Sequence, residues 1–517
     1  MSDAQLNDAQ HVITYGQQIE HLHPGISLFD AASHGPEELK AYLRNKVQPI
    51  DRVAFVVGPG FVTDSMHGQA IKVIRSMLVE KALAQTMSQK TLHRTSRLVG
   101  SNILHNLGQA ARLGTSFASN NQFHGTPPPA FIVGAGPSLD ANIAEIKEAQ
   151  RRGIIIAVDV AGPALSRAGI SPDFWISLES SPMREHLVTS DLDGTRALVL
   201  DMSCSPDLVD EAMSTNIPVM FTTTLDNAVH WASRMFGALP IANGGSVSTL
   251  AMSLAIMWRC NPIVLVGQDH AFGPEHDLHY YASGSLYGDT TIKLGDNRVA
   301  EFVGAKKHHP AQLIPVQAWG GQGIVMTMGD YLAYNRWFAR AAHAYSRTAL
   351  GPATQWIDCT EGGARKGPPW RDERLADLVR GLPANSCWNI SEPTPSSQDT
   401  LRYLVEREYS IIISHGRQML ELSTRVMAGQ AAGDPAAAHD EIKLRELSFD
   451  LPVFSCFCAP AFAKLKLTHG MPFRERRRAY CQASHAATED MLEVAIAAAT
   501  RYCPRPPSLR PTLPPTL

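Results

Sequence analysis

Short apolar runs alternate with helical patterns between residues 130 and about 360. Each run is almost continuously apolar, which is typical of strands buried on both faces of a sheet. The helical segments between successive runs provide the crossovers that parallel strands need. The pattern therefore predicts an α/β domain with a mostly parallel, Rossmann-like sheet and helices on both faces. Its strands are expected at residues 130–133, 154–158, 174–178, 197–200, 217–221 and 263–266.

The segments on either side of this region have different patterns. Before it, an apolar run at 53–57 ends in Gly58-Pro59-Gly60 between helical patterns, which predicts a small α/β or helical domain. After Pro368-Pro369, helical patterns continue to about residue 503, and a proline-rich segment follows. The sequence therefore predicts four parts: an N-terminal domain at 1–115, a Rossmann-like domain at 116–368, a helical C-terminal domain at 369–503 and a disordered tail at 504–517.

Composition and charge exclude several classes of protein. The 517 residues are 44% hydrophobic, enough for substantial cores, and the net charge of −3 gives no basic field for nucleic acid. No uninterrupted apolar run approaches the roughly 18 residues of a membrane span, and the polar N-terminus has no signal-peptide core. The eight cysteines are scattered without paired zinc-site spacing. We therefore expect reduced thiols and a cytoplasmic protein.

A glycine-rich turn follows the first apolar run of the alternating region. In FIVGAGPSLD, residues 131–140, three apolar residues lead into the turn and a helical pattern begins at Leu139. Glycines let the backbone approach a ligand, and the free N–H groups of a helix start favour an anion. An ordinary strand-to-helix turn shows the same pattern, so spacing alone leaves both interpretations open. The candidate nucleotide-binding residues here are Gly134, Ala135, Gly136, Pro137 and Ser138.

Acidic residues follow the next two predicted strands. Asp159 comes directly after 154–158, and Glu179 comes after 174–178. Parallel sheets bind ligands outside the carboxyl ends of their strands, where a carboxylate can hold a ribose or a metal, or act as a base. Each carboxylate could instead cap the helix that follows it. We include both as candidate nucleotide-binding residues.

A second glycine-rich turn, at 243–248, feeds the apolar helical segment 249–258. The free N–H groups and the dipole of this helix start favour an anion. The strand at 263–266 then ends in a Gly-Gln-Asp-His sequence. Two glycine turns and three acidic strand ends in one sheet are less expected by chance than any of them alone. The candidates here are Gly244, Gly245, Ser246, Ser248, Gly267 and Gln268 for nucleotide binding, and Asp269 and His270 for catalysis.

Residues 273–330 are rich in Gly, Pro, His and Tyr, which predicts a long irregular lid or substrate loop. This segment holds a third catalytic candidate, His279. Its histidines lack a convincing metal-site spacing, so we assign no metal. An amphipathic helix at 330–344 and a third glycine-rich strand end at 359–364 follow.

Four motifs in this order resemble the motility accessory factor family of flagellin glycosyltransferases. The domain that carries them also covers archaeal enzymes similar to 6-hydroxymethylpterin diphosphokinase, and the central part is similar to bacterial sialyltransferases. Two residues depart from the family pattern, because Glu179 stands where aspartate is expected and His270 where leucine is common. The motifs are FIVGAGPSLD, AVDVAGPALSRAGISPDFWISLE, NGGSVSTLAMSLAIMWRCNPIVLVGQDHAF and DCTEGGARKG.

The resemblance implies a CMP-activated nonulosonic acid, of the pseudaminic or legionaminic type, as the sugar donor. It also implies a protein acceptor with Ser/Thr hydroxyls, such as flagellin. The first glycine turn would lie against the nucleotide or its phosphate, and the second would hold the phosphate or the sugar carboxylate. Transfer needs a base for the acceptor hydroxyl and stabilisation of the leaving phosphate. Asp269, His270 and His279 are the candidates for the base, and we favour Asp269 for a role in the site.

Two alternatives remain open. The first is pyrophosphoryl transfer from ATP to a pterin alcohol, which needs magnesium held by carboxylates such as Asp159, Glu179 and Asp269. The second is a nucleotide-binding scaffold that kept the fold and lost its chemistry, because Glu179 and His270 depart from the family pattern. The oligomeric state and the identities of sugar and acceptor stay open.

Overall fold

The chain divides into two compact units, residues 1–89 and 90–517. The structure is a computed structural model that describes residues 95–503 apart from 113–115, 119–122, 124–125, 225–230, 233–235, 237, 239, 273–278, 280, 295–298, 305–310, 385–387, 389–397 and 460–472. Most of the expected N-terminal domain and the whole expected tail lie outside these residues. The division into four parts stays a prediction.

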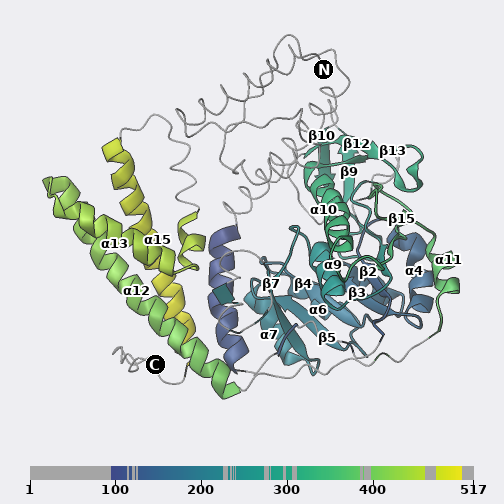
Figure 1. The fold of residues 1–517 in the computed structure, drawn as a ribbon, viewed down its shortest axis with the longest axis horizontal. Coiled ribbons are helices and arrows are strands. Elements are labelled where there is room, and N and C mark those ends of the chain that lie inside the picture. The colour runs from purple at the N-terminus through teal and green to yellow at the C-terminus, as the bar shows by residue number, and fades with distance from the viewer. Residues whose placement is uncertain are drawn as a thin grey trace, which may run out of the picture. The chain divides into compact units, whose positions relative to one another are not determined.

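A ten-stranded sheet, all of whose strand pairs are parallel, is the core of the second unit (Figure 1). This confirms the predicted α/β fold with its Rossmann-like sheet. Six strands coincide with the six predicted apolar runs, and all their residues are buried. The strands are β1 (Ser116–Phe117), β2 (Ala130–Val133), β3 (Ile154–Val158), β4 (Phe174–Ser177), β5 (Ala197–Asp201), β6 (Val219–Thr224), β7 (Pro240–Ile241), β8 (Ile263–Val266), β14 (Trp356–Asp358) and β15 (Arg371–Asp372).

Successive residues of each strand point to opposite faces of the sheet, and each face has its own helices. On one face, Ile132 and Ile156 pack in a core with α9 (Val247–Met257) and α10 (Gly329–Ser346). On the other, Phe131 and Ile155 pack with α4 (Leu139–Ala149), α5 (Gly162–Arg167) and α11 (Leu375–Gly381). The continuous apolar runs therefore follow from burial on both sides.

The strand order creates one crevice at the carboxyl edge of the sheet. The order is β1-β6-β5-β4-β3-β2-β8-β14-β15, so the chain leaves β2 in one direction and returns on its other side at β8. Parallel sheets bind ligands at such a reversal point, outside the carboxyl ends of the two strands. The glycine turn after β2 and the Gly267–His270 turn after β8 meet there.

Long helices of the C-terminal region cover the outer part of the same sheet. They are α12 (Gln398–Ala432), α13 (Ala436–Asp450) and α15 (Phe473–Tyr502), as the predicted helical C-terminal region requires. Together with the helix at 95–112, they share one core with Trp175, Leu198 and Phe221 of β4, β5 and β6. The short helices α6 (Arg184–Val188) and α7 (Pro206–Ser214) pack beside them. Within the described residues, no helix has the length and apolar character to cross a membrane.

The segment predicted as one long irregular loop, 273–330, contains strands in its described part. One antiparallel sheet joins β9 (Thr291–Leu294), β10 (Val299–Val303) and β11 (Ala311–Gln312). A hairpin joins β12 (Ile314–Gln317) to β13 (Ile324–Thr327). The prediction of a wholly irregular loop is therefore wrong. The strands are short, and Gly, Pro, His and Tyr are frequent in the segments around them, so the overall composition concealed them.

Candidate functional site

A cavity of about 290 Å³ lies at the carboxyl ends of β4, β3, β2 and β8. Its lining comes from seven separate stretches of chain, which include both glycine turns and the three acidic strand ends of the predicted convergence. Of the candidates from the sequence, the lining includes Gly134, Ala135, Gly136, Pro137, Asp159, Glu179, Gly245, Ser246, Ser248, Gly267, Gln268, Asp269 and His270. Ser138, Gly244 and His279 are candidates outside this lining. The functional roles of all these residues stay predictions.

The first glycine turn packs directly against the end of β8. Gly134 donates its N–H to the carbonyl of Val266 at 2.9 Å, and Gly136 donates to that of Gly267 at 2.8 Å. A Cβ at Gly136 would overlap the Asp269 carboxylate. Glycine is therefore required here for the close approach of two strand ends, whatever ligand the turn contacts.

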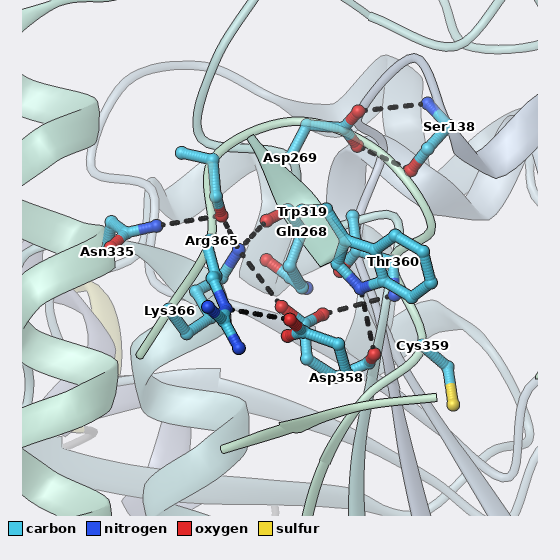
Figure 2. A network of polar contacts seen from close by, with 12 residues as sticks. Ser138, Gln268, Asp269, Trp319, Asn335, Asp358, Cys359, Thr360, Arg365 and Lys366 are labelled. Carbon is cyan, nitrogen blue, oxygen red and sulfur yellow. Dashed lines mark hydrogen bonds and ion pairs between the residues drawn. The ribbon is translucent and has the colours of Figure 1, made fainter. Parts of the chain in front are cut away.

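Asp269 joins the end of β8 to the start of α4 (Figure 2). Its Oδ2 accepts a hydrogen bond from Ser138 Oγ at 2.7 Å, and its Oδ1 accepts one from Ser138 N at 3.2 Å. A carboxylate at a helix N-terminus satisfies a free N–H group and interacts favourably with the dipole. Burial raises the pKa of Asp269 to about 6, against the lowering effects of the Ser138 hydrogen bonds and the positive charge of Lys366.

His270 is a buried, neutral imidazole beside an aromatic wall. Its backbone has a φ of +46°, a left-handed conformation that is uncommon for a residue with a Cβ. The ring lies 6.0 Å from that of Tyr331, 6.3 Å from Tyr334 and 5.3 Å from Phe338, between centroids. Burial, helped by the charge of Lys366, holds the pKa of His270 well below its ordinary value. Its Nδ1 has no hydrogen-bond partner among the described residues.

The second glycine turn ends in a well-capped helix start. Ser246 is the N-cap of α9, and its side chain accepts a hydrogen bond from Thr249 N while the Thr249 side chain accepts one from Ser246 N. Gly245 has a φ of +94°, which favours glycine at this position. Within the described part of the chain, Val247 and Ser248 make no backbone hydrogen bond through their N–H groups. Both residues line the cavity, so α9 presents two donors to an anion there.

Gly244, the candidate just before this cap, packs outside the cavity lining. It donates its N–H to Thr249 Oγ1 at 2.9 Å, and a Cβ there would overlap the ring of Trp337. This contact gives Gly244 a packing role at the start of α9.

The carboxylates that follow β3 and β4 differ in how many hydrogen bonds their oxygen atoms accept. Asp159 is buried, and its oxygens accept hydrogen bonds from Val160 N at 2.8 Å and Ser177 Oγ at 2.6 Å. Glu179 accepts one from Ser181 N at 3.2 Å through Oε1. Among the described residues, nothing donates to its Oε2. Glu179 therefore has more capacity than Asp159 to receive a hydroxyl of a ligand.

The cavity lining differs from the sequence prediction at His279, which it lacks, and at five residues that the sequence did not single out. His279 forms an isolated bridge with Thr291 and does not line the cavity. The first turn of α10 supplies a wall that the sequence did not single out, although the amphipathic pattern of 330–344 marked the helix. The additional polar, sulfur-containing and aromatic lining residues are Tyr281, Met328, Asp330, Tyr331 and Tyr334. No group of three or more His, Cys, Asp or Glu side chains in the described segments could hold a metal ion.

Comparisons with known proteins agree with this architecture. A family model described as 6-hydroxymethylpterin diphosphokinase MptE-like matches residues 101–275, which contain both glycine turns and the end of β8. An uncharacterized protein of Treponema pallidum (strain Nichols) is 36% identical over 135 residues, 25% of this chain and 23% of that protein. The chain thus matches about a quarter of the length of that relative.

A solved structure shares the fold over most of the chain. The structure of MAf glycosyltransferase from Magnetospirillum magneticum AMB-1 has a TM-score of 0.54 and 15% sequence identity, over 91% of this chain and 70% of that one. At this identity the likeness shows a common fold. The domain match and the structural likeness together support the resemblance to the motility accessory factor family.

Proposed function

We propose that this protein is a glycosyltransferase that moves a nonulosonic, sialic-like acid from a CMP-activated donor to Ser/Thr hydroxyls of a protein acceptor such as flagellin. The observation that carries the proposal is the cavity at the strand reversal point, where the N-terminus of α9 presents two N–H groups that no described residue accepts. The MptE-like match and the glycosyltransferase fold of the structural neighbour support it. We also propose a cytoplasmic location, supported by seven described cysteines that are buried and form no disulfide with one another.

The dimensions and chemistry of the cavity suit a nucleotide-sugar. Four adjacent strand ends form its floor, and three strand spacings extend it by about 14 Å. The donor phosphate would lie at the α9 N-terminus, where the N–H groups of Val247 and Ser248 stabilise charge as the phosphate leaves. The carboxylates of Asp159 and Glu179 would accept hydrogen bonds from sugar or ribose hydroxyls.

The acceptor hydroxyl needs a base at this cavity. Asp269 and His270 border it, whereas His279 lies outside the lining, so we retain the first two for this role. A pKa of about 6 gives Asp269 a greater proton affinity than an ordinary carboxylate while leaving it mostly ionised at neutral pH. Ser138 donates one hydrogen bond to each of its oxygens, and each oxygen keeps a second lone pair that can accept a proton.

Ligand binding tests the proposal directly. We expect CMP and CMP-activated sugars to raise the melting temperature, with the same shift in magnesium and in EDTA, because helix N–H donors hold the phosphate. UMP and AMP serve as controls for base selection. Ser248→Ala is a matched variant that retains the helix N–H groups but removes one hydroxyl, and it should weaken CMP binding only modestly. If no cytidine nucleotide changes the melting temperature, the glycosyltransferase proposal is refuted.

A second candidate activity is pyrophosphoryl transfer from ATP to a pterin alcohol, favoured by the name of the matching family model. Magnesium would bridge the phosphates, and Asp159 and Glu179 are the cavity carboxylates that could hold it. This activity predicts release of AMP from ATP when 6-hydroxymethylpterin and magnesium are present. If no AMP forms under these conditions, the second candidate is removed and the first is unaffected.

A further inference from the structure

A buried lysine lies beside the cavity floor and joins the ends of β8 and β14 (Figure 2). The Lys366 side chain is fully enclosed. Its Nζ donates to the carbonyl of Gln268 at 2.6 Å and to that of Ala364 at 3.0 Å, and lies 3.7 Å from Asp358 Oδ2. Asp358 is itself fully buried, at the end of β14.

The ammonium group is enclosed by protein. Two of its three N–H donors bond the Gln268 and Ala364 carbonyls, and Asp358 Oδ2 lies at an ion-pair distance that is too long for a hydrogen bond. Lys366 is also absent from the residues that line the cavity. A direct role in binding phosphate or forming a covalent intermediate is therefore inconsistent with the geometry. Lys366 instead contacts the backbone of Gln268, a cavity residue, and that of Ala364, which bonds to Asp269 and Asn335.

Those contacts connect Lys366 to two segments that line the cavity, the turn after β8 and α10. The Gln268 carbonyl immediately precedes Asp269 and His270. The Ala364 carbonyl also accepts a hydrogen bond from Asn335 Nδ2 of α10 at 3.1 Å, and Ala364 N donates to the Asp269 carbonyl at 2.7 Å. One ammonium group thus connects the turn after β8, the loop after β14 and the helix that carries the aromatic wall.

Stability alone is a poor explanation for this arrangement. Burying an ion pair carries a desolvation penalty, and an apolar replacement of similar volume is often neutral or stabilising. Burial raises the pKa of Asp358, as expected for a carboxylate removed from water, and Lys366 opposes that rise. What an apolar side chain cannot supply is the pair of hydrogen bonds to the Gln268 and Ala364 carbonyls.

We propose that Lys366 is a positioning residue, which holds the Gln268–His270 turn and, through Ala364 and Asn335, the start of α10 in the arrangement that binds the ligand. This inference deepens the proposed function and rests on it for the identity of the ligand. The positioning itself is a property of the ligand-free protein, so it can be tested separately.

Two neutral double variants of the full chain separate hydrogen bonding from charge. Asp358→Asn with Lys366→Met removes both charges and all three donors. Asp358→Asn with Lys366→Gln also removes both charges but keeps an N–H₂ donor on a side chain of similar length. Because neither variant leaves an unpaired buried charge, both should melt close to the wild-type temperature. We expect the methionine variant to bind CMP about tenfold more weakly, equivalent to about 1.4 kcal/mol, and the glutamine variant to recover part of that loss.

Titration calorimetry with CMP distinguishes the outcomes. Wild-type affinity in the methionine variant, or equal losses in both variants, would overturn the positioning role. Asn335→Ala removes only the contact from α10 to Ala364, and keeps the test available if the methionine variant does not fold. We expect it to weaken CMP binding a few-fold, and unchanged affinity would count against the proposal.

Amide hydrogen exchange of the ligand-free protein tests the role of Lys366 even if the proposed function is wrong. If the wild type binds no cytidine nucleotide, that function is wrong, and amide hydrogen exchange then decides the role of Lys366. We expect residues 263–272 and 328–338 to exchange faster in the methionine variant than in the glutamine variant, while β5 stays unchanged as an internal reference. Equal exchange in the two variants at both segments refutes the positioning role.

Discussion

Replacing Asp269 by asparagine should stabilise the protein at neutral pH while impairing its site. Asp269 is buried, and burial raises its pKa from the ordinary 3.8 to about 6. Asparagine has the same shape and carries no charge. Its oxygen can still accept the Ser138 N–H, and its N–H₂ can donate to Ser138 Oγ once that hydroxyl rotates. The substitution therefore removes a buried charge and retains both contacts.

The pKa shift sets the size and the pH dependence of this effect. A rise of about two units, at 1.36 kcal/mol per unit, corresponds to about 3 kcal/mol. Because the folded state binds the proton more tightly than the unfolded state, protonation favours folding. Wild-type stability should accordingly fall, relative to the variant, as the pH rises from 3.8 to about 6. The advantage of Asp269→Asn is expected to reach up to about 3 kcal/mol at pH 7 and to shrink in acid.

Urea unfolding followed by circular dichroism at several pH values between 4.5 and 7.5 measures this difference. Asp377→Asn on α11, whose side chain is 51% exposed, shows what the same chemical change does at the surface. CMP binding by Asp269→Asn, measured in parallel, should weaken if Asp269 serves the site. A stability difference between wild type and Asp269→Asn that does not change with pH would refute the reasoning about the buried carboxylate.

Three further substitutions test separate features of the site. Gly136→Ala places a Cβ on the Asp269 carboxylate and should destabilise the fold by about 1–3 kcal/mol, measured by urea unfolding; an unaltered midpoint would contradict the close approach of the two turns. Ser246→Ala removes the N-cap that accepts the Thr249 N–H and should lower stability by about 1 kcal/mol, with weaker CMP binding by calorimetry; a loss of affinity without any loss of stability would instead indicate a direct ligand contact. Glu179→Gln should weaken binding of a CMP-activated sugar without changing the melting temperature, and equal binding by both proteins would remove Glu179 from the ligand site.

The strands of the main sheet were the most predictable part of the fold. The runs at 130–133 and 154–158 became β2 and β3 because four or five consecutive apolar residues satisfy burial on both faces of a sheet. The short strands in 291–327 were missed. Their described residues are partly exposed and mixed in character, so neither burial nor strict alternation marks them in the sequence.

The parts of the candidate site that residues close together in the sequence form were predictable. The capped start of α9 is local, since Ser246 and Thr249 lie three residues apart. The wall from α10 and the contacts of Lys366 join segments far apart in the sequence, with Lys366 reaching a carbonyl 98 residues away. No periodicity or spacing marks such a partner, because the fold alone brings the two segments together.

By itself, the sequence determined that a parallel α/β sheet forms and that glycine turns and acidic residues stand at its strand ends. These are local consequences of apolar runs and turn chemistry. Only the tertiary structure decided that β2 and β8 are neighbours, and hence that Gly136 must lack a Cβ because Asp269 occupies that space. The tertiary structure also decided that Asp269 accepts two hydrogen bonds from Ser138, which lies after β2. The physical reason is that strand order and the burial of a charge depend on the packing of the whole chain.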